Sequence, residues 1–211
     1  MFASNLARAL ALPGVLVAIL AQASPLLVTV DTSALTGVSA IIAFDLTGGP
    51  TPGNTVTLSN FATDGTLGSS STTGTVSGAF PGIVTLDDTI TFFNEYSQAE
   101  TLGTTFSFAF DTTGNAPADP AFPDGFSLFL LDPNNVGPFG PLPLVSTSDP
   151  TGADSLLLYN IGEPDPLSVY QSDAVTVSVT GVPEPGTLAL ALAGLLALPV
   201  LRSVRKYSLR R

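Results

Sequence analysis

Carboxylates dominate the reactive side chains in the long central part of the chain, residues 24–181. This part contains no His, Cys, Lys or Arg, which excludes thiol chemistry, Ser-His-Asp catalysis, Schiff-base formation and His-ligated zinc. A glycosidase with paired carboxylates is the enzyme class left open, and Asp87, Asp88, Glu95 and Glu100 are its candidates. Adjacent Asp87 and Asp88 would point to opposite faces of a strand, which suits a turn better. We therefore expect no enzymatic activity and assign no catalytic residue.

Binding of Ca²⁺ or of a carbohydrate is the other chemistry that these residue types allow. Asp87-Asp88 and Asp132-Pro-Asn-Asn135 could supply oxygen ligands from loops, but neither has EF-hand or nonapeptide-repeat spacing, and both suit turns. No metal site or cofactor is assigned, and Ca²⁺ stays an open alternative. A carbohydrate face would have to use Tyr96, Tyr159 or Tyr170, because residues 24–181 contain no Trp.

Charge is segregated along the chain. All 17 carboxylates lie between Asp31 and Glu184, whereas the six basic residues lie at the two ends. An acidic surface of this kind repels nucleic acid and anionic lipid and attracts Ca²⁺ or basic partners. Residues 24–181 have the length of one domain, and without cysteine that domain must be held by a hydrophobic core.

Apolar and polar residues alternate through this acidic domain. Ala40, Ile42, Phe44 and Leu46 share one phase, as do Phe106, Phe108 and Phe110, and later Val175, Val177 and Val179. A period of two is typical of half-buried strands, and further strands are predicted at 26–31, 55–61, 82–86, 89–96, 126–131 and 155–159. These elements predict an all-β fold, an antiparallel β-sandwich with a jelly roll as one candidate topology. The phenylalanine stripe then packs into the core, and a ligand-binding stripe is the alternative.

Three stretches lack this alternation. Residues 114–125 and 132–152 are rich in Pro and Asp and predict long loops, which often carry binding on a sandwich. Residues 65–78 are rich in Gly, Ser and Thr, and they predict either a flexible segment or a loosely paired edge.

Residues 1–23 have the order of a secretory signal peptide. Arg8 precedes the apolar stretch 9–20, and the small-x-small sequence Ala21-Gln22-Ala23 follows it. The apolar stretch is short for a membrane span and contains Pro13-Gly14. We therefore expect signal peptidase to recognise Ala21 and Ala23 and to leave Ser24 as the mature N-terminus.

The C-terminal segment, residues 182–211, predicts a single transmembrane helix. The Leu/Ala run 187–201 would measure about 22 Å as a helix, and basic side chains can snorkel toward the edge of a hydrocarbon core of about 30 Å. These flanking basic residues are Arg202, Arg205, Lys206, Arg210 and Arg211. Positive charge beyond the helix predicts a cytoplasmic tail and an acidic domain outside.

The C-terminal segment resembles a PEP-CTERM protein-sorting signal. The resemblance is carried by Pro183, Glu184 and Pro185, followed in order by the Leu/Ala helix and the basic tail. Pro199, inside the predicted helix, is a small departure from the pattern. The acidic domain also resembles an uncharacterised group of PEP-CTERM proteins in its order of Asp31-Thr32-Ser33-Ala34-Leu35, a Gly-rich middle and Gly152-Ala153-Asp154-Ser155-Leu156.

The resemblance implies an exported protein of Gram-negative bacteria that secrete exopolysaccharide. Its partners would be signal peptidase, the membrane, an exosortase acting near the Pro-Glu-Pro motif, and extracellular polysaccharide. It implies a precursor anchored in the inner membrane, then a place at the cell surface or in the extracellular matrix. The corresponding function is structural or adhesive, in an exopolysaccharide or biofilm context. A carbohydrate- or calcium-binding module is the alternative, with the glycosidase behind it.

Overall fold

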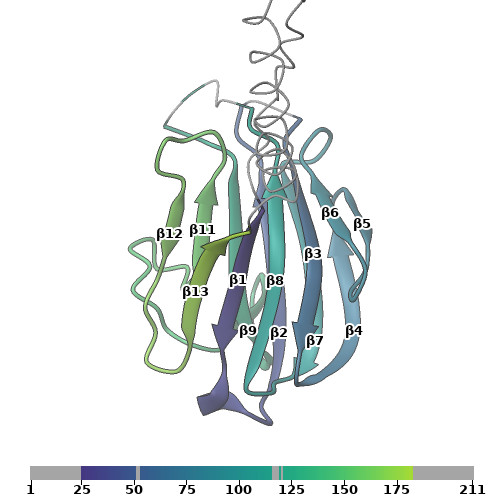
Figure 1. The fold of residues 1–211 in the computed structure, drawn as a ribbon, viewed down its shortest axis with the longest axis vertical. Coiled ribbons are helices and arrows are strands. Elements are labelled where there is room, and N and C mark those ends of the chain that lie inside the picture. Colours follow the sequence, from purple (N-terminus) through teal and green to yellow (C-terminus); the bar gives the residue numbers. More distant parts are fainter. Residues whose placement is uncertain (1–24, 51–52, 116–118, 120, 183–211) are drawn as a thin grey trace, which may run out of the picture.

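Two antiparallel β-sheets make up the described part of the chain (Figure 1). The computed structural model describes residues 25–50, 53–115, 119 and 121–182. Thr, Val, Phe and Ser are abundant there and favour extended backbone, and the one helical element described is the short 3₁₀ helix η1 (Ser33–Leu35). The all-β prediction is confirmed for these residues.

The strands divide between two sheets, which we call sheet A and sheet B. Sheet A has the order β13 (Thr176–Gly181), β1 (Leu26–Asp31), β8 (Thr105–Thr112), β3 (Thr55–Thr63), β6 (Val84–Asp87), β5 (Val76–Gly78). Sheet B has the order β12 (Leu167–Val169), β11 (Leu157–Asn160), β9 (Gly125–Gly137), β2 (Ser39–Thr47), β7 (Phe93–Thr101), β4 (Thr66–Thr73). In addition, β10 (Gly140–Pro143) pairs with β9.

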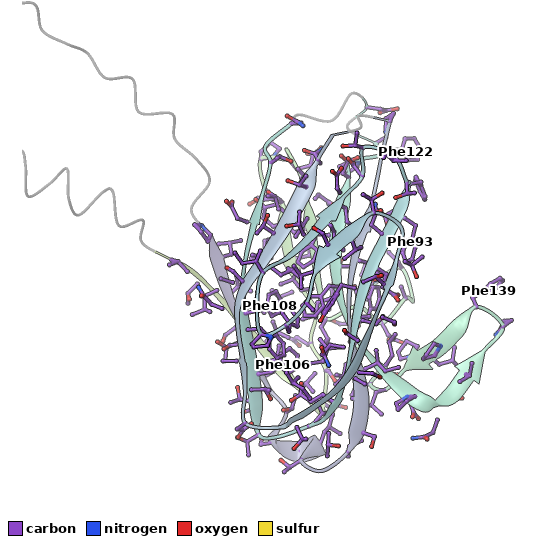
Figure 2. The ribbon with its side chains drawn as sticks, turned by 90° about the vertical axis from the view of Figure 1, so that its right-hand side faces the viewer. Phe93, Phe106, Phe108, Phe122 and Phe139 are labelled. Atoms are coloured by element: carbon purple, nitrogen blue, oxygen red, sulfur yellow. The ribbon has the colours of Figure 1, made fainter. Side chains whose placement is uncertain are left out.

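The hydrophobic core lies between the two sheets. Alternate residues of β2 and β8 point into it, and the rings of Phe44 and Phe108 meet edge to face with centroids 4.9 Å apart. Phe106, Phe108 and Phe110 are each at most 2% exposed, and Figure 2 shows Phe106 and Phe108 inside the molecule. The prediction that this stripe packs in the core is confirmed.

The structure extends or shifts several predicted elements. Residues 65–78 include the exposed edge strand β4, which pairs with β7, so the loosely paired edge is the correct alternative. The loop predicted at 132–152 begins with the end of β9 and with β10, a hairpin that projects from the sandwich and carries the exposed Phe139 (Figure 2). The strand predicted from residue 89 begins only at Phe93, because residues 87–89 form a turn in which the Asp87 carboxylate accepts the Thr89 N–H at 2.7 Å.

Both ends of the described domain lie at one end of the sandwich, which we call the termini end. Leu26, the first residue of β1, pairs with Gly181, the last residue of β13 (Figure 1). The β2–β3 connection and the loop after β6 lie at the same end. Leu26 is opposite Phe110 near the end of β8, the end of β8 is opposite the start of β3, and Thr55 at that start is opposite Asp87.

The terminal predictions fall outside the described residues. These include the signal-peptidase site, the Pro-Glu-Pro motif, the apolar run and the basic tail. Among the residues that are described, no helix has the length and apolar character needed to cross a membrane. Export, sorting and anchoring therefore remain predictions.

Candidate functional site

Two buried carboxylates meet between loops at the termini end. Asp88 directly follows β6, Asp124 directly precedes β9, and Asn54 directly precedes β3. Asp88 is 5% exposed, Asp124 is 2% exposed and Asn54 is 1% exposed. Such burial is rare for an aspartate without a cationic partner. We call Asn54, Asp88 and Asp124 the acidic loop cluster.

Hydrogen bonds fix both carboxylates of the acidic loop cluster. The Asp88 Oδ1 atom accepts the backbone N–H groups of Gly53 and Asn54, each at 2.7 Å. Asp124 accepts the Gly49 N–H at one oxygen and the Asn54 side-chain amide at the other. The Asn54 Oδ1 atom accepts the Thr113 hydroxyl at 2.7 Å, which fixes the orientation of the amide. The cluster therefore ties the segments before β3, after β6 and before β9 to one another.

The second oxygen of Asp88 has no partner among the described residues. This Oδ2 atom is fully buried and accepts no hydrogen bond from them. Burial raises the pKa of Asp88, the Gly53 and Asn54 amides oppose that rise, and the neighbouring Asp124 carboxylate adds to it. A buried carboxylate oxygen needs a proton, a hydrogen-bond donor or a cation. Residues 24–181 contain no Lys, Arg or His that could supply a cationic side chain.

Glycine makes room for the oxygens around this cluster. A Cβ atom on Gly48 would lie 3.3 Å from Asp88 Oδ2 and 3.5 Å from the Phe92 carbonyl oxygen. A Cβ atom on Gly49 would collide with the Phe122 carbonyl oxygen and lie 2.8 Å from Asp124 Oδ1. Space therefore requires glycine at position 49 and leaves a Cβ atom little room at position 48, and side-chain and backbone oxygens lie beside both residues.

A second carboxylate pair lies on the outer face of sheet B. Asp45 of β2 is directly opposite Glu95 of β7, and the Asp45 Oδ1 atom is buried and has no hydrogen-bond partner among the described residues. Burial, and then the Glu95 carboxylate, raises the pKa of Asp45 to about 8. Glu95 accepts the Ser97 hydroxyl at 2.6 Å. Asp45 therefore holds a proton near neutral pH, because two adjacent carboxylates do not ionise together.

The carboxylates singled out from the sequence do not form one site. Asp88 lies in the acidic loop cluster, while its neighbour Asp87 accepts a turn hydrogen bond. Glu95 faces outward on β7, and Glu100 is buried near the other end of that strand, where it accepts the Thr63 hydroxyl. Asp132 accepts the Asn134 N–H at 2.8 Å within strand β9. The turn interpretation is confirmed for Asp87, whereas residues 132–135 belong to a strand.

The sequence did not indicate a role for three residues of these sites, Asp124, Asn54 and Asp45. The Pro-Asp-Gly sequence at 123–125 resembles an ordinary turn, and nothing in the sequence places it beside Asp88. Asp45 sits in the polar phase of a strand, and only the β2–β7 register brings it to Glu95. Within the described residues, no three Asp or Glu side chains gather closely enough to hold a metal by themselves.

A cleft lies at the edge where the chain crosses from β12 to β13. It measures about 790 Å³ and is lined by residues 146–148, 169–173 and 175–177. Gln171 and Ser148 hold its two sides together, since the Ser148 N–H donates to the Gln171 carbonyl at 2.8 Å and the Gln171 N–H donates to the Ser148 hydroxyl at 2.9 Å. Of the three tyrosines singled out, Tyr170 lines this cleft, Tyr96 is buried in the core, and Tyr159 packs against Phe110.

Comparison of the chain with protein-family models, with curated proteins and with solved structures gave no match. Its function therefore has to be inferred from the chemistry and the arrangement of its own residues. The described part offers three features that could engage other molecules: the acidic loop cluster, the Asp45–Glu95 pair and the Tyr170 cleft.

Proposed function

We propose that the chain is an exported surface or extracellular-matrix protein that passes through a PEP-CTERM/exosortase pathway. Its precursor is anchored in the inner membrane by a single helix over the apolar run 187–201, and the acidic domain is structural or adhesive rather than enzymatic. The observation that carries this proposal is the order of the Pro-Glu-Pro triplet, the apolar run and the basic tail at the C-terminus. The setting that this order implies is a Gram-negative biofilm rich in exopolysaccharide.

The geometry of the termini end supports this arrangement. Leu26 and Gly181 are paired neighbours, so the predicted signal peptide and the predicted anchor join the domain at the same end. Only residues 182–186 separate β13 from the apolar run, a reach of about 17 Å when extended. Large apolar side chains are also exposed near this end, among them Ile90, Phe92 and Phe122. An anchored precursor would hold this end close to the membrane and present the β9–β10 hairpin outward.

The strand order supports a jelly roll as the finer description of the domain. Consecutive strands β1 to β4 alternate between sheets A and B. The chain then returns so that β7 lies beside β2 and β8 lies beside β1. This wrapped connectivity is that of paired Greek keys, and β9 to β13 extend the two sheets on one side.

Replacement of Pro183, Glu184 and Pro185 by alanine should block loss of the C-terminal segment. Signal-peptide removal and membrane insertion should persist, because the apolar run and its basic flank are unchanged. Intact-mass measurement of membrane and released fractions from an exosortase-bearing host would check this. A matched triple-alanine replacement of Thr176, Ser178 and Thr180, exposed on β13, controls for an effect of substitution near the anchor. Release of the motif variant at the rate of the natural chain would contradict the proposal.

The cleft at Tyr170 favours a second candidate function, carbohydrate binding. A half-exposed aromatic ring beside hydroxyl, amide and carboxylate groups is the combination that contacts a sugar's apolar face and its hydroxyls. Ser146, Thr147, Ser172 and Asp173 line the same cleft, together with Gln171. An extracellular polysaccharide would be the natural ligand class for this site.

Tyr170→Ala should weaken polysaccharide binding by about 10-fold or more, which corresponds to the loss of one stacking contact of about 1.4 kcal/mol. Affinity electrophoresis in gels that contain the exopolysaccharide of the host would measure it. Tyr170→Phe keeps the ring and should retain most of the retardation, and Phe139→Ala removes an exposed ring outside the cleft and should retain all of it. Equal retardation of the natural chain and Tyr170→Ala would remove this second function.

A further inference from the structure

We propose that the acidic loop cluster is a binding site for one Ca²⁺ ion, with Asp88 and Asp124 as its carboxylate ligands. The Asn54 side chain and the backbone carbonyls beside Gly48 and Gly49 complete its protein surroundings. The site goes beyond the sorting function proposed above and does not depend on it, because it lies within the described domain.

One oxygen of the Asp88 carboxylate is buried and unpaired among the described residues. The Asp88 Oδ2 atom is buried, accepts no hydrogen bond from the described residues, and lies 3.3 Å from the position that a Cβ atom on Gly48 would occupy. An isolated buried charge is strongly unfavourable, so buried carboxylates are paired with cations or bind metals. The acidic domain has no side-chain cation of its own, so a cation that pairs with the ionised Asp88 carboxylate would come from solution.

N–H donors surround the two carboxylates of the acidic loop cluster. Four N–H donors converge on the two carboxylates, from Gly49, from Gly53, and from the backbone and side chain of Asn54. N–H donors favour the ionised form of a carboxylate. The pair on sheet B differs, because no N–H donor of the described residues reaches the Asp45 Oδ1 atom, and Asp45 can keep a proton instead. When both carboxylates of the cluster are ionised they repel each other, and a divalent cation bound between them would relieve that repulsion.

The candidate ligand atoms of the acidic loop cluster are all oxygens. Asp88 Oδ2 and the Phe92 carbonyl lie beside Gly48, and Asp124 Oδ1 and the Phe122 carbonyl lie beside Gly49. All are oxygens, and neither His nor Cys is present, which disfavours zinc. A mixture of carboxylate and carbonyl oxygens in irregular loops, completed by water, suits the flexible coordination of Ca²⁺ better than the strict octahedron of Mg²⁺.

A bound ion would lock the termini end. The segments that supply the cluster are joined by a backbone hydrogen bond from Asp88 to the Asn54 carbonyl at 3.1 Å, and by the hydrogen bonds that the two neighbouring carboxylates accept. A cation shared by Asp88 and Asp124 replaces the repulsion between their ionised carboxylates with attraction and stabilises the folded state, since the ligands are far apart in the unfolded chain. The loops 48–50, 53–54, 88–92 and 121–124 should all become more protected.

Thermal unfolding of the purified full chain in CaCl₂ and in NaCl at equal ionic strength tests the proposal. Calcium at about 100 times its dissociation constant should raise the midpoint by roughly 5 to 10 °C above the NaCl control. MgCl₂ should give less than half of that increase. Identical curves in CaCl₂ and NaCl would overturn the proposal, because they would show screening alone.

Two substitutions separate this site from general charge effects. Asp88→Asn retains an oxygen for the Gly53 and Asn54 amides but removes the free anionic oxygen, and it should abolish the calcium-specific increase. Asp87→Asn removes the same charge one residue away and should retain the increase in full. Retention of the whole increase by Asp88→Asn would place the ion elsewhere and overturn the assignment.

Hydrogen exchange of the natural chain decides the matter even if Asp88→Asn does not fold. Calcium should slow exchange in peptides that cover residues 48–54 and 88–92, and leave the η1 turn at 33–35, at the opposite end, unchanged. Uniform slowing or no slowing would contradict a site at the acidic loop cluster.

Discussion

The free energy of unfolding should fall by roughly 2 to 4 kcal/mol between pH 4 and pH 8, and Asp45→Asn should remove most of that fall. Burial and the adjacent Glu95 raise the pKa of Asp45 to about 8 in the folded chain, whereas an unfolded aspartate has a pKa of about 3.9. Between these values the folded state holds a proton that the unfolded state has released. The contribution of Asp45 to stability is therefore fully present below about pH 4 and decreases as the pH rises toward 8, by at most about 1.4 kcal/mol per pH unit.

Chemical denaturation of the natural chain and of Asp45→Asn, repeated from pH 4 to pH 8, measures this effect. Asparagine is neutral at every pH and can donate to Glu95, so the variant should match the natural chain at pH 4 and exceed it at pH 8. Asp165→Asn removes the same charge from an exposed position and should reproduce the pH profile of the natural chain. Because Asp45 keeps part of its surface exposed, the fall should stay below the full 1.4 kcal/mol per unit. Parallel profiles for all three chains would show that Asp45 ionises normally.

Much of the fold was predictable because strand alternation is a local signal. The limits of β1 coincide with the predicted strand, and the inward phase of β2 is the one that Ile42, Phe44 and Leu46 indicated. The edge strand β4 was ambiguous, since a Gly/Ser/Thr segment buries little and is ordered by its pairing with β7 rather than by its own side chains. The hairpin of β9 and β10 escaped prediction because prolines at both of its strands suggested a loop.

The candidate sites were far less predictable, because each depends on contacts between distant residues. Asn54 and Asp124 are separated by 70 positions, and their hydrogen bond exists only because the loops before β3 and β9 converge at the termini end. Asp45 and Glu95 similarly depend on the register of two strands, and a shift by one residue would turn one of them to the other face. The sequence indicated Asp88 as a possible source of oxygen ligands, but it did not indicate that the Asp124 carboxylate lies beside it.

Phe108→Ala should destabilise the chain by about 3 to 5 kcal/mol. The Phe108 side chain is completely buried, and its ring contacts Phe44 of the facing sheet edge to face. Alanine would leave a cavity between β8 and β2, and it would remove an aromatic pair that contributes about 0.5 to 1.5 kcal/mol beyond its buried area. Since a domain of this size is stable by only about 5 to 15 kcal/mol, the variant should unfold at a visibly lower denaturant concentration.

Phe139→Ala is the matched control, because it makes the same chemical change at the tip of the projecting hairpin (Figure 2). Phe139 is fully exposed, so its removal should change the free energy of unfolding by no more than about 0.5 kcal/mol. The comparison separates the two interpretations of the phenylalanine stripe. A core residue contributes to stability in the absence of any ligand, whereas a ligand-binding residue would leave the unfolding midpoint nearly unchanged. Equal midpoints for Phe108→Ala and Phe139→Ala would therefore contradict the packing of Phe108 between the two sheets.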